Sequence, residues 1–395
     1  MILNLTEYIC LVQASRLHIT EFLSTSKEHI VLDVRSPAEY NHAYIPGAVS
    51  LPLFSDEERK IVGTAYKQES REKAIKLGLD FFGPKMRKMV EEVEAMCSSQ
   101  NAFGRDTNSA LPVTKSVFIY CWRGGMRSGA VSWLLGLYGF KVYTLAGGYK
   151  AFRNLVLKTF EQPFHFKILG GYTGSGKTLI LQELQKKGET IIDLEELARH
   201  KGSAFGNIQM PAQPTQEMFE NLLAEELIKR ASINFDTSII NNENDLTEPA
   251  AHSFHATPGP AIWLEDESQR IGNLNLPMAI WETMRLSPLY FLEIPFEERL
   301  EYIVREYGHC EVQKLIDATH RISRRLGGLE TKNAVSFFEQ GNIKEAFRIL
   351  LCYYDKRYLK GLHSRENIST LLNKIVCEKV STSNSQLLIN QYQIL

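Results

Sequence analysis

The stretch HFKILGGYTGSGKTLILQELQKKG, residues 165–188, predicts the fold of the second half of the chain. It starts with a short apolar run, continues through closely spaced glycines and ends with apolar residues at helical spacing. A buried strand, a glycine-rich turn and an amphipathic helix in this order are typical of a parallel α/β sheet. Residues 171–178 match G-x-x-x-x-G-K-[ST], the pattern of a loop that wraps around phosphate groups.

Each residue type that the pattern specifies has a chemical reason. Gly171, Gly174 and Gly176 let the backbone bend so that its amides face phosphate oxygens. Lys177 pairs with the phosphate charge, and the Thr178 hydroxyl is suited to hold Mg²⁺. The pattern predicts a di- or triphosphate site. The pattern is not specific for ATP hydrolysis. No motif that reads adenine or guanine follows it, so the sequence leaves open whether a nucleotide binds and which one.

A second support for Mg²⁺ is expected at the acidic end of the strand AIWLE, residues 261–265. The candidates are Glu265, Asp266 and Glu267, and we assign the ion to Thr178 and Asp266. A solvated acidic turn after a strand is the alternative for each of these carboxylates.

Similar apolar segments alternate with helical patterns along the chain, which indicates an α/β protein with parallel sheets. Strands are expected at 29–34, 116–120, 165–170, 190–194, 261–265 and 289–294. We expect one α/β domain over 14–158, a phosphate-loop domain over 164–295 and a mostly helical C-terminal region over 296–395. The polar segments 98–114 and 241–260 are interpreted as loops or insertions without an assigned function.

The composition agrees with a folded protein of several domains. At about 150 residues per domain, 395 residues predict two to three of them. The net charge of −1 excludes a uniformly basic nucleic-acid binder, so an RNA partner would need a local basic patch. The 6 cysteines are scattered and form no C-x-x-C pair, which argues against a zinc ribbon or a disulfide framework.

The N-terminal residues 1–20 carry no basic segment ahead of their apolar residues, and no apolar run approaches the roughly 20 residues that span a bilayer. We therefore expect no export signal, no membrane contact and a reducing cytoplasmic location. There, each cysteine either fills the core or carries chemistry.

One cysteine stands in an unusual setting, FIYCWRGGMRSG at 118–129. A strand delivers Cys121 to its end, two glycines follow, and a helix opens at about 127. Amides curling at a helix N-terminus form a cradle for an anion, and Arg123 and Arg127 add positive charge. The same setting stabilises a thiolate, so Cys121 is the candidate nucleophile. The alternative is a buried cysteine that merely ends a strand.

This loop and its surroundings resemble the rhodanese superfamily. DVRSPAEYNHAYIPGAVSLP (33–52) and LAGGYKAF (145–152) are similar to further segments of that family, and the resemblance covers about 14–158. It implies a rhodanese-like parallel-sheet domain. Arg127 follows Cys121 by six positions, as in rhodanese-fold phosphatases and arsenate reductases, so the cradle suits a tetrahedral phosphate-type anion. Asp33 and Arg35 are expected to brace the fold by ion pairing.

Together with the phosphate loop, the chain resembles the tRNA 2-selenouridine synthase family. The similar segments are VGTAYKQESREKAIKLG (62–78), CWRGGMRS (121–128), DLEELARHKGSAFG (193–206) and WLEDESQRIGNLNLP (263–277). The resemblance implies replacement of sulfur by selenium in the wobble 2-thiouridine of tRNA, with selenophosphate as donor. It also implies an S-geranyl-2-thiouridine intermediate made from geranyl diphosphate. Neither co-substrate is a permanently bound cofactor.

The same resemblance implies two roles for Cys121 and leaves both open: it carries selenium as S-selanylcysteine, or it attacks the activated base. The phosphate loop is expected to grip the diphosphate of the prenyl donor. For tRNA, the densest basic cluster is ATHRISRRLGG (318–328), and Arg321, Arg324 and Arg325 are the candidate contacts. An ordinary charged helix face is the alternative.

Three other functions fit parts of the sequence. They are an ATP-dependent sulfurtransferase that acts on another acceptor, a phosphatase-like hydrolase built on the Cys-x₅-Arg spacing, and a nucleotide-switched binding module with an inert Cys121. The choice of tRNA, the protein partners and the oligomeric state are left open by the sequence.

Overall fold

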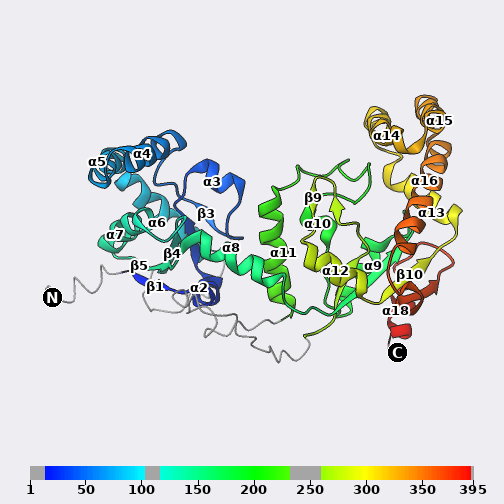
Figure 1. The fold of residues 1–395 in the computed structure, drawn as a ribbon, viewed down its shortest axis with the longest axis horizontal. Coiled ribbons are helices and arrows are strands. Elements are labelled where there is room, and N and C mark those ends of the chain that lie inside the picture. Colours follow the sequence, from blue (N-terminus) through cyan, green and yellow to red (C-terminus); the bar gives the residue numbers. More distant parts are fainter. Residues whose placement is uncertain (1–13, 103–115, 232–258, 393–395) are drawn as a thin grey trace. The chain divides into compact units, whose positions relative to one another are not determined.

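The computed structural model describes residues 14–102, 116–231 and 259–392. Within these ranges the chain divides between Lys158 and Thr159 into two compact units (Figure 1). Each unit has its own parallel sheet, as the alternation of apolar and helical segments predicts.

The first unit is built on a sheet of order β1-β5-β4-β2-β3, in which every neighbouring pair is parallel. Its central strand β4 has the sequence SVFIY, buried from its second residue on, as is typical of strands covered on both faces. Its elements are β1 (Ser15–Leu17), α2 (Ile19–Thr25), η1 (Ser26–Glu28), β2 (Ile30–Asp33), α3 (Pro37–His42), β3 (Val49–Ser50), α4 (Asp56–Gln68), α5 (Arg71–Phe82), η2 (Gly83–Lys85), α6 (Met86–Ala102), β4 (Ser116–Tyr120), α7 (Met126–Tyr138), β5 (Lys141–Leu145) and α8 (Gly148–Thr159).

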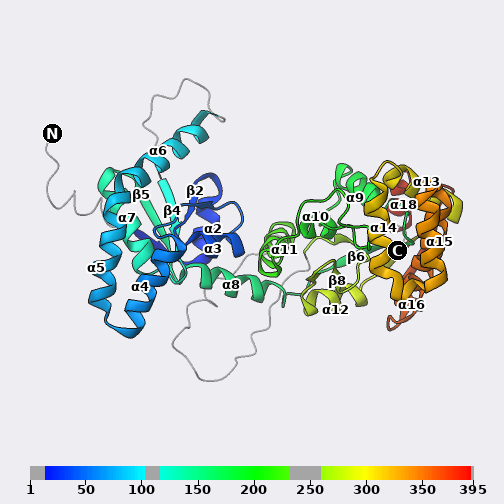
Figure 2. The same cartoon turned by 90° about the horizontal axis from the view of Figure 1, so that it is seen from above.

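Helices α4 and α5 form a pair between β3 and β4, and they lie side by side in both views (Figures 1 and 2). Local sequence sets where each begins. Ser55 accepts from the Glu58 amide while the Glu58 side chain accepts from the Ser55 amide, a capping box that starts α4. Ser70 accepts from the Lys73 amide and starts α5.

The polar segment 98–114 begins differently from the loop that the sequence predicts. Helix α6 continues through Ala102, and the hydroxyls of Ser98 and Ser99 donate to the carbonyls of Glu94 and Ala95 one turn earlier. Residues 103–114 of this segment and 241–258 of the other lie outside the described residues.

The second unit has a sheet of order β11-β10-β6-β7, again all parallel. The phosphate loop follows β6, which lies between β10 and β7. Its elements are β6 (Phe166–Gly171), α9 (Lys177–Lys186), α10 (Leu194–Ala198), α11 (Gln216–Ala231), β7 (Ile262–Glu265), β8 (Arg270–Ile271), β9 (Leu274–Asn275), α12 (Met278–Leu286), β10 (Leu289–Glu293), α13 (Phe296–Tyr307), α14 (Val312–Leu326), α15 (Gly328–Glu339), α16 (Ile343–His363), α17 (Ile368–Leu371), β11 (Leu372–Val376) and α18 (Asn384–Tyr392).

The region beyond residue 296 is mostly helical, as the sequence predicts, and it also contains one strand that the sequence analysis did not predict. Strand β11 returns to the sheet and pairs with β10 over five residues, from Leu289–Leu372 to Glu293–Val376. The helices therefore share one compact unit with the phosphate loop. The expected strand at 190–194 is reduced to a bridge between Ile191 and Trp263, because Asp193 already caps α10 through the Glu196 amide.

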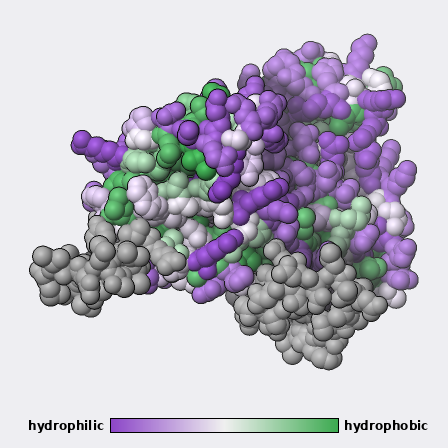
Figure 3. All heavy atoms as spheres, turned by 60° about the vertical axis from the view of Figure 1, so that its left-hand side comes forward, coloured by the Kyte–Doolittle hydropathy of each residue, from purple (hydrophilic) through white to green (hydrophobic). Residues whose placement is uncertain are grey.

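On the face seen in Figure 3, hydrophilic side chains predominate among the coloured residues, with apolar side chains between them. Among the described residues, no helix combines the length and the apolar character that crossing a membrane requires. Cys121, Cys310, Cys352 and Cys377 are free thiols.

Candidate functional site

The cysteine loop lies at the carboxyl end of β4, where parallel sheets place ligands. Cys121 directly follows the strand and is only 3% exposed. The Gly125 amide donates to its Sγ at 3.3 Å, and the Ser128 Oγ lies 3.3 Å from the same sulfur. The start of α7 therefore points an amide and a hydroxyl at the thiol, and the Ser128 hydroxyl is a contact that the sequence analysis did not assign.

A second glycine loop holds the cysteine loop in place. Gly148 has a φ of +60°, and a Cβ there would come within 2.3 Å of the Cys121 carbonyl oxygen. This close approach lets the Tyr149 amide donate to that carbonyl at 2.8 Å. The segment LAGGYKAF thus supports the loop from outside.

The electrostatics favour the thiolate. Burial raises the pKa of Cys121, but the Ser128 hydrogen bonds, the Gly125 amide and the Arg127 charge outweigh it. The net pKa is therefore lowered from the usual value of 9.0. A thiol that is more acidic than usual next to a ring of amides has the properties of a nucleophile.

The two arginines of the loop have different surroundings. Both terminal nitrogens of Arg127 donate to the Glu39 carboxylate, at 2.6 and 3.3 Å. The guanidinium is thus paired with Glu39, whereas the sequence predicts that it supplies positive charge to the anion cradle. Burial raises the pKa of Glu39, yet Arg127, the Ser36 amide and Arg59 lower it to about 2. Arg123 is exposed. Glu39 is a partner that sequence reasoning missed, because it comes from α3, far from the loop in sequence.

The expectation that Asp33 and Arg35 brace the fold is confirmed. Arg35 Nη2 and Nε donate to the buried Asp33 carboxylate at 2.6 to 3.0 Å, and Tyr120 also donates to it at 2.8 Å. The guanidinium lies 3.9 Å from the centre of the Tyr149 ring. This buried cluster ties β2 to β4 beneath the cysteine loop.

The backbone of the phosphate loop adopts conformations that favour glycine at three positions. Gly171, Gly174 and Gly176 have φ values of +153°, +83° and +68°. A Cβ at Gly174 would meet the Arg299 carbonyl oxygen at 2.9 Å, so α13 packs against the loop. Lys177 and Thr178 open α9 directly after it.

Three carboxylates gather behind Lys177: one oxygen each of Glu195, Glu265 and Glu267 lie within 4.8 Å of one another. Burial lowers the pKa of Lys177, but these carboxylates outweigh it and raise the pKa. Burial and mutual repulsion raise the pKa of Glu267 to about 8 and that of Glu195 to about 10. Such a set of hard oxygen donors fits a divalent cation, which would relieve the repulsion.

The carboxylates that could hold Mg²⁺ with Thr178 differ from the expected Asp266: they are Glu265, Glu195 and Glu267. Thr178 Oγ1 donates to Glu265 Oε1 at 2.8 Å, so Glu265, not Asp266, is its acidic neighbour. Asp266 instead pairs with Arg365 and accepts from the Tyr358 hydroxyl at 2.6 Å. Alternate residues of a strand point to opposite sides, which separates the two carboxylates. Sequence reasoning missed Glu195: its segment DLEELARHKGSAFG was matched to the family, but no role was assigned to its carboxylates.

A cavity of about 480 Å³ extends from the phosphate loop to the C-terminal helices. Its lining combines the loop and the carboxylates with further polar groups, among them Lys201 and Glu306, and with an apolar wall. The wall residues are Phe205, Ile303, Phe347, Leu350 and Leu351. The cavity therefore offers charged groups and apolar surface side by side, and Ile303 lies close to Gly174 of the loop.

The predicted basic cluster lies on α14, where Arg321, Arg324 and Arg325 are exposed on one face. Arg321 is engaged within the protein: it donates to the Ala204 carbonyl at 2.8 Å and to Asn207 Oδ1 at 2.9 Å. It thereby holds the loop that borders the phosphate-loop cavity.

Comparison with known proteins matches both units. Residues 20–155 match the rhodanese-like domain model, and residues 164–247 and 232–374 match the model of the tRNA 2-selenouridine synthase AAA domain. The chain is 33% identical over 359 residues to a tRNA 2-selenouridine synthase of Sulfurovum sp., covering 84% of this chain and 87% of the relative. A tRNA 2-selenouridine synthase of Bdellovibrio bacteriovorus is 32% identical over 379 residues, covering 85% and 89%.

Among solved structures, the N-terminal domain of a putative ATP/GTP binding protein from Clostridium difficile 630 is 35% identical, with a TM-score of 0.31. That match covers 36% of this chain and 99% of the other. A rhodanese-related protein from Thermoplasma volcanium is 16% identical, with a TM-score of 0.19, covering 35% and 89%.

Proposed function

The chain belongs to the tRNA 2-selenouridine synthase family, and from this membership we propose how its two loops replace the sulfur of a wobble 2-thiouridine with selenium. The phosphate loop activates the sulfur by prenylation, and the cysteine loop exchanges the prenylated sulfur for selenium. Geranyl diphosphate and selenophosphate are the co-substrates. Family membership favours this reaction over a sulfurtransferase, a phosphate-ester hydrolase or a binding module.

The apolar wall beyond the phosphate loop carries the first half of this proposal. Ile303, Phe347, Leu350 and Leu351 line the cavity that begins at Lys177. A geranyl chain needs such a wall, since each buried methylene contributes about 0.8 kcal/mol. A nucleotide base is instead oriented by a few placed polar groups. A diphosphate on the loop with its hydrocarbon tail on the apolar side chains uses both kinds of lining.

In the first reaction the 2-thio sulfur of the uridine attacks C1 of geranyl diphosphate. A sulfur–carbon bond forms, the carbon–oxygen bond breaks with its electron pair, and diphosphate leaves while the base loses its N3 proton. Lys177 and the loop amides hold the growing charge of the diphosphate. Thr178, Glu265, Glu195 and Glu267 would hold Mg²⁺ at the same place, and the ion supplies further neutralisation of the leaving group when bound.

In the second reaction Cys121 acts on the base. The thiolate adds to C2 of the S-geranyl base and geranylthiolate leaves, taking a proton as geranylthiol. Selenium of selenophosphate then attacks C2 and expels Cys121. Water cleaves the phosphorus–selenium bond to give phosphate and the 2-selenouridine. Every electron pair is accounted for in this sequence without an oxidant or a reductant.

Two other roles of Cys121 fit less well. An S-selanylcysteine formed from selenophosphate needs an oxidation of selenium for which no oxidant is available. Attack on phosphorus, as in a phosphatase, needs Arg127 to face the bound anion, yet its guanidinium is held by Glu39. Attack on the activated base has neither requirement.

The proposal predicts that a substitution in the phosphate loop impairs prenylation of the tRNA, whereas a substitution of the cysteine impairs only selenium incorporation. Lys177→Ala should lower the rate of prenyl transfer to thiouridine tRNA by roughly 10²-fold or more, because the leaving diphosphate loses its cation. Cys121→Ser should abolish selenium incorporation and still yield S-geranyl-tRNA. Nucleoside analysis by mass spectrometry after incubation with each co-substrate measures both steps.

Lys186→Ala is the matched control, since Lys186 ends the same helix α9 at an exposed position. Unchanged prenyl transfer by Lys177→Ala would refute the role of the phosphate loop. Intact selenium incorporation by Cys121→Ser would refute the role of the cysteine.

A further inference from the structure

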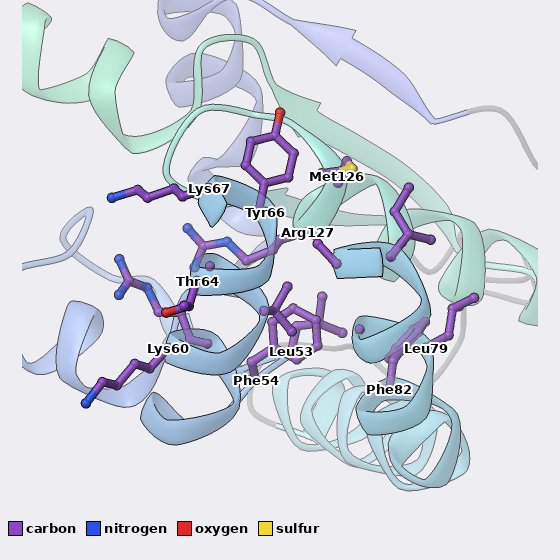
Figure 4. Close-up of a pocket in the computed structure, with 17 residues that line it drawn as sticks. Leu53, Phe54, Lys60, Thr64, Tyr66, Lys67, Leu79, Phe82, Met126 and Arg127 are labelled. Carbon is purple, nitrogen blue, oxygen red and sulfur yellow. The ribbon is translucent and has the colours of Figure 1, made fainter. Parts of the chain in front are cut away.

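A second cavity, of about 650 Å³, opens in the first unit between α4, α5 and the start of α7. Figure 4 shows Leu53 and Phe54 between the two helices, with Leu79 and Phe82 contributed by α5. The lining is mainly apolar, and its volume falls in the range of about 300–1,000 Å³ that holds small molecules. None of the steps assigned above uses it.

The cavity wall includes the first residues of α7, the helix that follows the cysteine loop. Met126 and Arg127 line it, and the amide just before them, that of Gly125, contacts the Cys121 sulfur. Leu53, Phe54 and Phe82 belong to the same hydrophobic cluster as Cys121. A group bound in this cavity would therefore lie next to the cysteine loop.

Large apolar side chains at its mouth reach solvent: Tyr66 is 52% exposed, Leu79 56% and Met126 52%. Exposed apolar groups that converge on a hollow indicate a binding site for an apolar ligand. Lys60 and Lys67 also line the cavity, and their side chains extend outward from α4 in Figure 4. Their charges face away from the apolar floor. The phosphates of a nucleic acid would lie on this outer side, beside the lysines.

We propose that this cavity binds the geranyl group of the S-geranyl-2-thiouridine base while Cys121 acts on that base. The inference rests on the proposed function and adds the site that recognises the intermediate. The ligand it requires is a hydrocarbon chain attached to a nucleotide. An apolar floor bordered by Met126 and Arg127 at the start of α7, with lysines extending outward from α4, matches both parts of that ligand.

Gly63 gives a direct test, because it lines the cavity from α4 and a Cβ added there would meet no atom within 4 Å. Gly63→Leu should fill the space without displacing a neighbour, and leucine is the better helix former. The substrates are anticodon stem-loops that carry S-geranyl- or S-methyl-2-thiouridine, each given with selenophosphate. The wild type should prefer the geranyl substrate in kcat/KM by roughly tenfold or more.

Gly63→Leu should remove that preference. Its kcat/KM for the geranyl substrate should fall to the value for the S-methyl substrate, and its kcat/KM for the S-methyl substrate should equal that of the wild type. Prenyl transfer from geranyl diphosphate should also stay unchanged, because it belongs to the second unit. Gly361→Leu is the matched control, a helical glycine of α16 whose Cβ position is equally open. Leu79→Ser, at an exposed lining position, repeats the test independently of the glycine.

An undiminished geranyl preference in Gly63→Leu and Leu79→Ser would overturn the cavity assignment, and so would an equal loss on both substrates. A wild type that cannot convert the S-geranyl substrate at all would instead refute the two-step path. The two failures are therefore distinguishable.

Discussion

At the scale of single residues, the acidity of Cys121 depends on three neighbours that oppose its burial. The Ser128 hydroxyl, the Gly125 amide and the Arg127 charge favour the thiolate, and Ser128 is the strongest of the three. Since Ser128 lies in the first turn of α7, the helix that follows the cysteine loop also favours the thiolate.

Replacing Ser128 tests this directly. Ser128→Ala should raise the pKa of Cys121, so a smaller fraction is thiolate at pH 7 and alkylation by iodoacetamide slows by roughly threefold to tenfold. The two rates should converge at alkaline pH, above both pKa values, where the thiol is ionised in each protein. Peptide mass spectrometry follows Cys121 separately from the other cysteines.

Ser132→Ala is the control, because the Ser132 hydroxyl donates only to the Ser128 carbonyl, at 2.7 Å. Equal alkylation of Ser128→Ala and the wild type at pH 7 would contradict the role of this hydroxyl.

At the scale of elements, α14 presents its three arginines on one exposed face while its other face packs into the core. The three do not have the same role. Arg321 holds the 204–207 loop beside the phosphate-loop cavity, whereas Arg324 and Arg325 extend the basic face farther along the helix. We therefore propose Arg324 and Arg325 as the tRNA contacts of this element.

Removing both charges should weaken tRNA binding and flatten its salt dependence. Each phosphate contact contributes roughly 0.7 to 0.9 to the slope of log K against log salt, so Arg324→Ala/Arg325→Ala should lower the slope by about 1.5. Binding titrations over a series of salt concentrations measure it. The control is Arg87→Ala/Lys88→Ala, which removes two exposed charges from α6. An unaltered slope would exclude this face from the interface.

At the scale of the whole molecule, the proposed function gives each unit one site and one step. The phosphate loop, its carboxylates and its apolar wall belong to the second unit, and Cys121 with its adjacent cavity belongs to the first. In this proposal the two steps are linked by a geranylated tRNA, so they need not occur in one molecule of the enzyme.

A mixture of two inactive variants should therefore restore the reaction. Cys121→Ser makes S-geranyl-tRNA, and Lys177→Ala converts it to selenouridine-tRNA, although neither variant completes the path alone. Nucleoside analysis of the mixture, compared with each variant by itself, detects this. Absence of selenouridine from the mixture, with geranylated tRNA present, would contradict transfer between molecules.

The sequence identified both loops because their conformations are local. The positive φ of Gly174 and Gly176, the helix that opens at Lys177 and the amide near Cys121 follow from residues adjacent in the chain. The parallel sheets follow in the same way from the alternation of apolar and helical segments.

The partners of these loops come from distant segments, and only the tertiary structure shows them. Glu39 reaches Arg127 from α3, Glu195 joins Glu265 from α10, and β11 returns to the sheet from the far end of the chain. Both cavities likewise have walls from several elements. The chain alone determined which chemical groups are present and how each loop bends, because those depend on neighbouring residues. Packing decided which carboxylate meets which cation and where a hydrocarbon chain fits, because burial and charge act through space rather than along the sequence.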